Sequence, residues 1–117
     1  MKNKVEIQPV MDALEIIGGK WKFAIIYALC HGTLRFNQLR RELGRVTPKA
    51  LFSDLQQLEL NGLVSRRVIA TVPVTVEYSL TEYGKTLEPI LRQIQAWGKK
   101  HRQKTMTSVN GQQNMVG

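Results

Sequence analysis

The sequence is poor in cysteine, in long apolar runs and in acidic residues. Its single cysteine, Cys30, excludes a disulfide within the chain. There is no run of 18 apolar residues that could span a membrane, and the first ten residues are too polar for a signal peptide. The chain has only 9 Asp and Glu but 17 Lys and Arg, which gives a formal charge of +8. We therefore expect a cytoplasmic protein without a membrane partner, whose partner is anionic, most often nucleic acid.

Patterns typical of enzymes and metal sites are also missing. His31 and His101 have no Cys, Asp or Glu at metal-ligand spacing, and no Ser-His-Asp, Cys-His or paired-carboxylate arrangement is visible. We expect no enzyme activity, no metal and no cofactor. Cys30 lies in an apolar stretch and is interpreted as a small packed residue. The alternative is a redox-active thiol, which needs exposure and an electropositive setting.

The 117 residues suit one domain with a modest core. Apolar spacing predicts three helices in the first part of the chain, each followed by glycine. They span residues 10–17, 20–31 and 35–43. The second is apolar nearly all round, which indicates a central, buried helix.

A fourth helix is predicted from the stretch "TPKALFSDLQQL", residues 47–58. Thr47 suits the N-cap and Pro48 the first helical position. Leu51, Leu55 and Leu58 share one face. Because only the short turn "GRV" separates this helix from the third, the pair forms a helix-turn-helix.

The opposite face of this fourth helix carries side chains that can read DNA. Lysine can reach guanine, glutamine can bond adenine, serine can reach several base edges, and alanine can touch a thymine methyl. The N-terminal half of such a helix normally enters the major groove, which favours Lys49, Ala50 and Ser53 over Gln56 and Gln57. Taken alone, the same face is also compatible with an ordinary solvated surface.

Basic residues flank the fourth helix on both sides. Residues 33–67 hold seven basic and three acidic side chains, a net of +4. Phosphate contacts of this kind supply affinity and register. Arg66 and Arg67 begin the next element, and at most one is expected to reach a phosphate. The predicted DNA-binding residues are Arg40, Arg45, Thr47, Pro48, Lys49, Ala50, Ser53, Gln56, Gln57, Arg66 and Arg67.

The stretch "LVSRRVIATVPVTVEYSL", residues 63–80, predicts an antiparallel hairpin. Its second half alternates apolar and polar residues, as a half-buried strand does. The tip is expected near residues 70–74, where Pro73 suits a loop. A helix-turn-helix followed by a hairpin is a winged helix, so we predict an α+β, mainly α, fold.

The last predicted helix carries an apolar stripe over about 20 residues that begins after the cap Thr81, and Pro89 predicts a kink or break in it. This stripe is longer than one small core can cover, which predicts a homodimer whose seam is formed by the first and last helices. The candidate dimerisation residues are Val10, Leu14, Ile90, Ile94 and Trp97. We expect residues 1–101 to form the DNA-binding domain with its dimerisation helices and residues 102–117 to form a flexible tail.

Several stretches resemble the HxlR-type family of bacterial winged-helix regulators, in the MarR-like group. They are "GGKWKFAIIYAL" (18–29), "RFNQLRREL" (35–43), "LQQLELNGLVSR" (55–66), "VPVTVEYSLTEYGKTLEPIL" (72–91) and "AWG" (96–98). The resemblance covers residues 8–101. It implies a homodimeric transcription factor whose fourth helix enters the major groove, whose wing follows the duplex and whose terminal helices form the dimer.

The sequence departs from this family at two places. Many members have a cysteine before the proline that opens the first helix, where this chain has Gln8. The family wing often reads "VPPRVEY", whereas "VPVTVEY" here lacks the wing-tip arginine. The first difference argues against the usual N-terminal thiol sensor, and the second weakens phosphate contact at the tip.

Two functions are weighed from these observations. The leading one is a sequence-specific homodimeric regulator that binds a two-fold site on double-stranded DNA and controls adjacent genes in response to a small-molecule effector or a redox signal. The alternative is a winged-helix protein-interaction module with weak or non-specific DNA binding.

Overall fold

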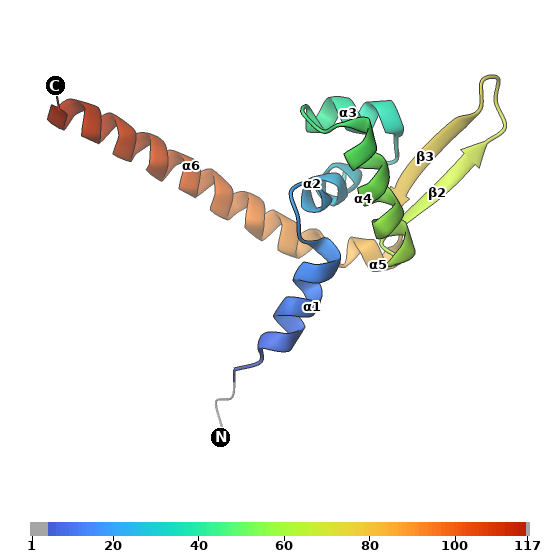
Figure 1. Ribbon diagram of the computed structural model, residues 1–117, viewed down its shortest axis with the longest axis horizontal. Helices are drawn as coiled ribbons and strands as arrows, with labels where there is room; N and C mark the ends of the chain where they lie inside the picture. The colour runs from blue at the N-terminus through green and yellow to red at the C-terminus, as the bar shows by residue number, and fades with distance from the viewer. Residues whose placement is uncertain (1–4, 117) are drawn as a thin grey trace. The chain divides into compact units, whose positions relative to one another are not determined.

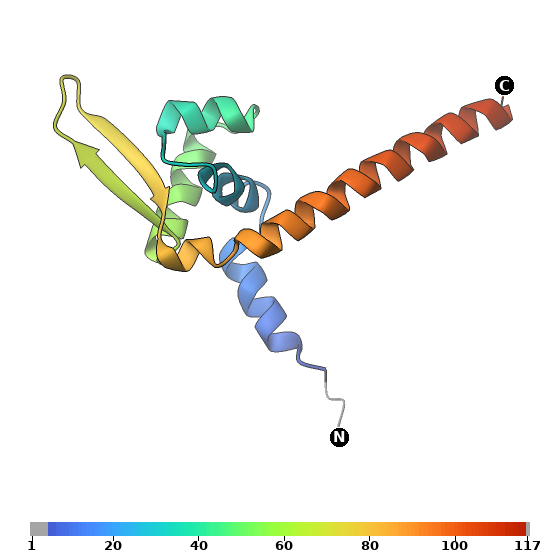
Figure 2. The same cartoon turned by 180° about the vertical axis from the view of Figure 1, so that it is seen from behind.

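The computed structural model describes the backbone of residues 5–116 and the side chains of residues 5–106. It has two compact units, one ending at Thr86 and the other beginning at Leu87. The elements, drawn in Figures 1 and 2, are α1 (Ile7–Ile17), α2 (Lys22–Leu29), β1 (Leu34–Arg35), α3 (Phe36–Leu43), α4 (Pro48–Leu60), β2 (Val64–Ile69), β3 (Thr75–Leu80), α5 (Glu82–Lys85) and α6 (Glu88–Val116).

The core of the first unit is built around α2, which packs against α3, α4 and β3. Ile25 and Ile26 of α2 are fully buried, as are Leu39 of α3 and Leu51 of α4. This confirms that the almost wholly apolar second helix is central. Around this core, α3 and α4 form the predicted helix-turn-helix.

The sheet has the order β1-β3-β2 and is antiparallel throughout. The β2–β3 hairpin runs in register from Val64↔Leu80 to Ile69↔Thr75, with its tip at residues 70–74. It extends away from the helices as a wing (Figures 1 and 2). The predicted hairpin, and with it the winged helix-turn-helix fold, is confirmed.

Strand β1 is a feature that the sequence analysis missed. It has two residues, paired as Leu34↔Tyr78 and Arg35↔Glu77. A two-residue strand is too short to show the period-2 alternation by which strands are recognised. It forms because β3, more than 40 residues further along the chain, offers a free edge.

Several helix ends differ from the expected ones. α1 begins three residues earlier than predicted, and α2 is shorter at both ends. The break predicted at Pro89 is confirmed: α5 ends at Lys85, and Pro89 lies in the first turn of α6, where a missing N–H is tolerated. The backbone of α6 continues to Val116, so the expected domain boundary after residue 101 falls inside this helix. Flexibility of residues 102–117 stays a prediction.

The base of the wing is joined to α5 through Thr81 and Gly84. The Thr81 amide donates to the Leu63 carbonyl at 3.1 Å, and the Gly84 amide donates to Thr81 Oγ1 at 2.9 Å. A Cβ at position 84 would lie 2.1 Å from the Leu63 carbonyl oxygen, which no side chain tolerates. Glycine therefore lets α5 sit against the start of β2 and fixes where the wing leaves the core.

Candidate nucleic-acid interface

The start of α4 is fixed by a few neighbouring residues that are recognisable in the sequence. Gly44 ends α3 with φ +83°, a conformation that favours glycine. Thr47 caps α4, since the Ala50 amide donates to its Oγ1 at 3.1 Å, and Pro48 occupies the first helical position. The Thr47 side chain, a predicted DNA-binding group, is thus engaged in holding the helix end.

The predicted division of α4 into two faces is confirmed. Leu51, Leu55 and Leu58 are 0%, 1% and 0% exposed. Ala50 is half-buried at the edge of the opposite face, whose exposed members are Pro48, Lys49, Ser53, Gln56 and Gln57. Their contact with bases stays a prediction.

The two glutamines of α4 face different neighbours, although they are adjacent in sequence. Gln57 turns towards α2: Lys22 Nζ donates to its Oε1, and its Nε2 lies 3.5 Å from Ser53 Oγ. Gln56 turns towards the wing and lines a hollow of about 280 Å³ that Arg66 also borders. Ser53 and Lys49 remain at the middle of the outer face.

Lys22 is the residue that sequence reasoning missed. It precedes its partner Gln57 by 35 residues and lies outside the helix-turn-helix, so no spacing rule could connect the two. Lys20, two residues earlier, behaves differently: its Nζ lies 5.2 Å from the centre of the Trp21 ring. Of the two, Lys22 is the one in contact with α4.

The predicted basic residues are all exposed, but they do not share one surface. Arg40 of α3 lines a polar hollow of about 410 Å³ beside Gly44, next to the turn that carries Arg45. Arg66 borders α4, whereas Arg67 points to the other face of the sheet because side chains alternate along a strand. The expectation that at most one of this arginine pair reaches a phosphate stays a prediction.

The tip of the wing is apolar and uncharged. Residues 70–74 contain no basic side chain, and Val72 at the tip is fully exposed. Thr71 Oγ1 donates to the Pro73 carbonyl at 2.7 Å and lies 2.8 Å from Thr75 Oγ1, which closes the loop on itself. The basic side chains of the wing therefore lie along β2, at Arg66 and Arg67, and not at its tip.

Cys30 is the C-cap residue of α2 and is half-buried. Its interpretation as a small packed residue stays a prediction. The expected helix continued to residue 31, whereas the regular helix ends at Leu29.

Among the described residues, no group of three or more His, Cys, Asp and Glu could hold a metal ion. Within the same part of the chain, no helix is long and apolar enough to cross a bilayer.

The predicted dimerisation residues are exposed in the units that contain them. Val10 and Leu14 lie on α1, and Ile90, Ile94 and Trp97 lie on α6. Large apolar side chains of this number, left open to water in one chain, are typical of a surface that a partner covers.

Comparison with known proteins identifies the family. The model of the HxlR-like helix-turn-helix family matches residues 16–106. YdeP, an HTH-type transcriptional regulator of Bacillus subtilis strain 168, is 45% identical over 94 residues, which are 80% of this chain and 73% of YdeP. The structure of the redox regulator HypR in its oxidised form is 47% identical, with a TM-score of 0.76, and covers 79% of this chain and 95% of HypR.

The structure of a more distant regulator is also similar to this chain. The transcriptional regulator YodB of B. subtilis, in its reduced form, is 31% identical with a TM-score of 0.71, and the match covers 82% of this chain and 94% of YodB. These relatives share the helix-turn-helix and wing described above. The chain belongs to the HxlR-like helix-turn-helix family of transcriptional regulators.

Proposed function

We propose that this regulator is a cytoplasmic homodimer that binds a two-fold DNA site and acts by binding, not as an enzyme. The observation that carries the proposal is the outer face of α4. Its first turns expose Lys49 and Ser53, while its three leucines are buried. Arg40 and Arg45 before the helix and Arg66 after it are exposed and positively charged.

The charges and the helix have separate roles in this proposal. Arg40, Arg45 and Arg66 neutralise phosphates, which supplies most of the affinity and makes it dependent on salt. Lys49 and Ser53 reach base edges in the major groove, which supplies sequence preference. Thr47 and Pro48 hold the helix end in place for both roles.

The two-fold site follows from the proposed dimer. Val10 and Leu14 of α1 and the exposed apolar residues of α6 form its seam. A two-fold dimer places two copies of α4 in successive major grooves, about 34 Å apart. The operator is therefore expected to be a palindrome with half-sites one helical turn apart.

Regulation in response to a small molecule or an oxidant is the last part of the proposal. HypR is described as a redox regulator. In this chain Gln8 stands where the resemblance leads one to expect a cysteine, and Cys30 is the only thiol. If oxidation of Cys30 is the signal, diamide will release the protein from DNA and Cys30→Ser will abolish that response. If DNA binding by the wild type is insensitive to diamide, a small-molecule effector remains as the signal.

The test is binding to a fluorescent fragment from the chain's own upstream region, measured by anisotropy against random DNA of equal length. We expect preference for the upstream fragment and an affinity that falls steeply with salt. The double variant Lys49→Ala, Ser53→Ala should lose about 30-fold or more in affinity, since two base contacts of at least about 1 kcal/mol each contribute at least about 2 kcal/mol together.

A matched control keeps this experiment specific. Lys99→Ala with Thr105→Ala removes the same charge and one hydroxyl from exposed positions of α6. It should leave affinity within about twofold of wild type, because surface changes away from the interface have small effects. Equal affinities for the two double variants would instead favour the protein-interaction module.

A further inference from the structure

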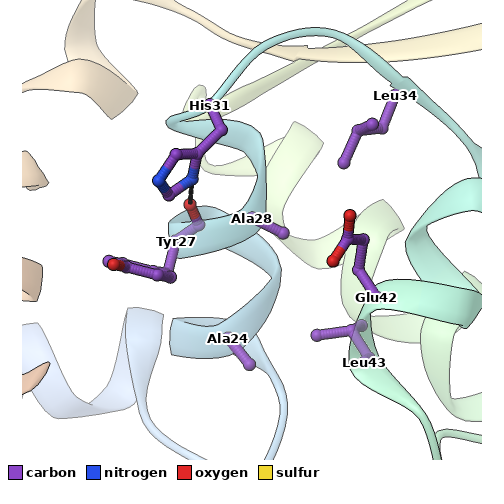
Figure 3. A pocket seen from close by; sticks show the side chains of 7 residues that line it. All are labelled: Ala24, Tyr27, Ala28, His31, Leu34, Glu42 and Leu43. Carbon is purple, nitrogen blue, oxygen red and sulfur yellow. Dashed lines mark hydrogen bonds between the residues drawn. The ribbon is translucent and has the colours of Figure 1, made fainter.

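A recess lies between α2 and α3, apart from the outer face of α4 (Figure 3). It has a volume of about 570 Å³, which is within the range of roughly 300–1,000 Å³ that small-molecule sites occupy. All of its lining residues belong to the first unit. They are Ala24, Tyr27, Ala28, His31, Leu34, Glu42 and Leu43.

The recess exists because α2 turns small side chains towards α3. Ala24 and Ala28 are four residues apart and so share one side of the helix, and Figure 3 shows both on the side that faces Glu42 and Leu43. Ile25 and Ile26, which point elsewhere, are fully buried in the core. Larger residues at the two alanine positions would close the gap.

The recess combines apolar side chains with Tyr27, His31 and one carboxylate, Glu42, which is exposed. Leu34 and Leu43 flank Glu42, and the Glu42 carboxylate points into the space between α2 and α3 (Figure 3). Among the side chains that the structure describes, Glu42 has no hydrogen bond and no salt bridge. The chain has 17 basic and 9 acidic residues, yet Glu42 is paired with none of the arginines that the structure describes and is the one acidic residue that lines the recess.

We propose that the recess binds a small organic cation, an amine with a compact apolar or aromatic body. The ammonium group lies against the Glu42 carboxylate, where a charge-assisted hydrogen bond forms. The body lies against Ala24, Ala28 and the two leucines. An anion of the same shape is repelled by Glu42, and a neutral analogue gains only the apolar contact.

Binding at this position acts on the helix-turn-helix. Glu42 and Leu43 are the last residues of α3, and the turn that begins at Gly44 leads directly into α4. A ligand wedged between α2 and the end of α3 displaces that turn, so we expect it to weaken operator binding, and by linkage operator DNA weakens ligand binding by the same factor. This regulatory step, unlike the binding step, rests on the proposed function.

Phenethylamine is the cationic probe, with 2-phenylethanol and phenylacetate as neutral and anionic analogues of the same size. Protein labelled with ¹³C at alanine methyls is titrated at constant pH and ionic strength. Saturable shifts are expected at the Ala24 and Ala28 methyls, and not at those of Ala50, Ala70 and Ala96. The expected affinity is on the order of a millimolar for the amine, and at least about tenfold weaker for both analogues.

Two variants make the proposal falsifiable. Glu42→Gln should weaken phenethylamine about tenfold, whereas Glu59→Gln, the same charge change at an exposed position of α4, should not. Ala28→Leu should fill the recess and abolish the shift at Ala24. Equal phenethylamine affinities in Glu42→Gln and Glu59→Gln, or tighter binding of phenylacetate than of phenethylamine, would overturn the proposal. This holds even if Ala28→Leu fails to fold.

Anisotropy on operator DNA separates this inference from the proposed function. Phenethylamine should lower DNA affinity in wild type, and about ten times as much should be needed for the same effect in Glu42→Gln. If the wild type shows no preference for any DNA, the proposed function fails, while the methyl shifts still decide whether the recess binds cations. If DNA binding is specific but the methyl shifts are absent, the recess proposal alone is wrong.

Discussion

Helices α4 and α6 have the same apolar spacing and opposite exposure. In α4, Leu51, Leu55 and Leu58 are at most 1% exposed. In α6, Ile90, Ile94 and Trp97 are 48%, 46% and 67% exposed. The leucine face of α4 is therefore covered within one chain, whereas Ile90, Ile94 and Trp97 of α6 stay exposed.

This difference teaches what an apolar stripe means. Periodicity shows that one face of a helix avoids water, but it does not show whether the same chain or another copy covers that face. A change in the stripe of α4 is expected to lower the stability of the fold, whereas a change in the stripe of α6 is expected to lower the stability of the assembly. Two substitutions test this contrast and two more test the outer face of α4, in order of decreasing expected effect.

The largest effect is expected from Leu55→Ala in α4. Removing a fully buried leucine side chain leaves a cavity and should lower the free energy of unfolding by about 2–5 kcal/mol. Urea denaturation followed by circular dichroism measures this loss. Gln56→Ala, at the next and exposed position, should stay within about 0.5 kcal/mol of wild type; a similar loss in both variants would contradict the assignment of faces.

Next is Ile94→Asp in α6, which places a charge in the proposed seam. The dimer dissociation constant should rise by about 30-fold or more, because a buried interface residue of this kind is worth about 2 kcal/mol or more. Analytical ultracentrifugation measures the constant. Gln95→Asp introduces a charge of the same sign one residue away; if it dissociates the dimer equally, the effect is one of charge and not of the apolar face.

Ser53→Ala changes the outer face of α4 without touching its core. Specific DNA affinity should fall by about 1–2 kcal/mol through loss of one base contact, with the urea midpoint unchanged. Selection of binding sites from a random library should show base preference relaxed at a single position in each half-site. Relaxation at every position, or at none, would mean that Ser53 does not read a base.

The smallest effect is expected from Lys22→Met, which removes the donor to Gln57. DNA affinity should fall by about 0.5–1.5 kcal/mol more than in Lys20→Met, which loses the same charge but whose Nζ lies over the Trp21 ring. A double-mutant cycle completes the test: in a Gln57→Ala background the two lysine variants should bind DNA equally. A difference that persists there would show that Lys22 acts on DNA without Gln57.

Local features of the sequence were sufficient to predict α4, its buried face and the wing. Thr47 and Pro48 start α4 through capping chemistry that involves only neighbouring residues. The leucine spacing fixes which side of α4 is buried, and the alternation ending at Leu80 predicts the hairpin. Each of these signals acts over a few residues, so no knowledge of the fold is needed to detect it.

Features that depend on distant residues were not predictable in this way. The contact of Lys22 with Gln57 and the pairing of β1 with β3 join residues tens of positions apart. Arg66 and Arg67 look equivalent in sequence, and only the packing of β2 against α4 decides which of them borders the recognition helix.

By itself, the sequence determined the elements and their apolar faces, because capping, periodicity and turn chemistry are local. It also determined the surplus of positive charge around α4. Only the tertiary structure decided which apolar faces are covered, where each charged side chain points, and that Ala24 and Ala28 leave a recess beside Glu42. These outcomes depend on packing between elements that are far apart in the chain, and that packing is decided by how the elements fit together in three dimensions.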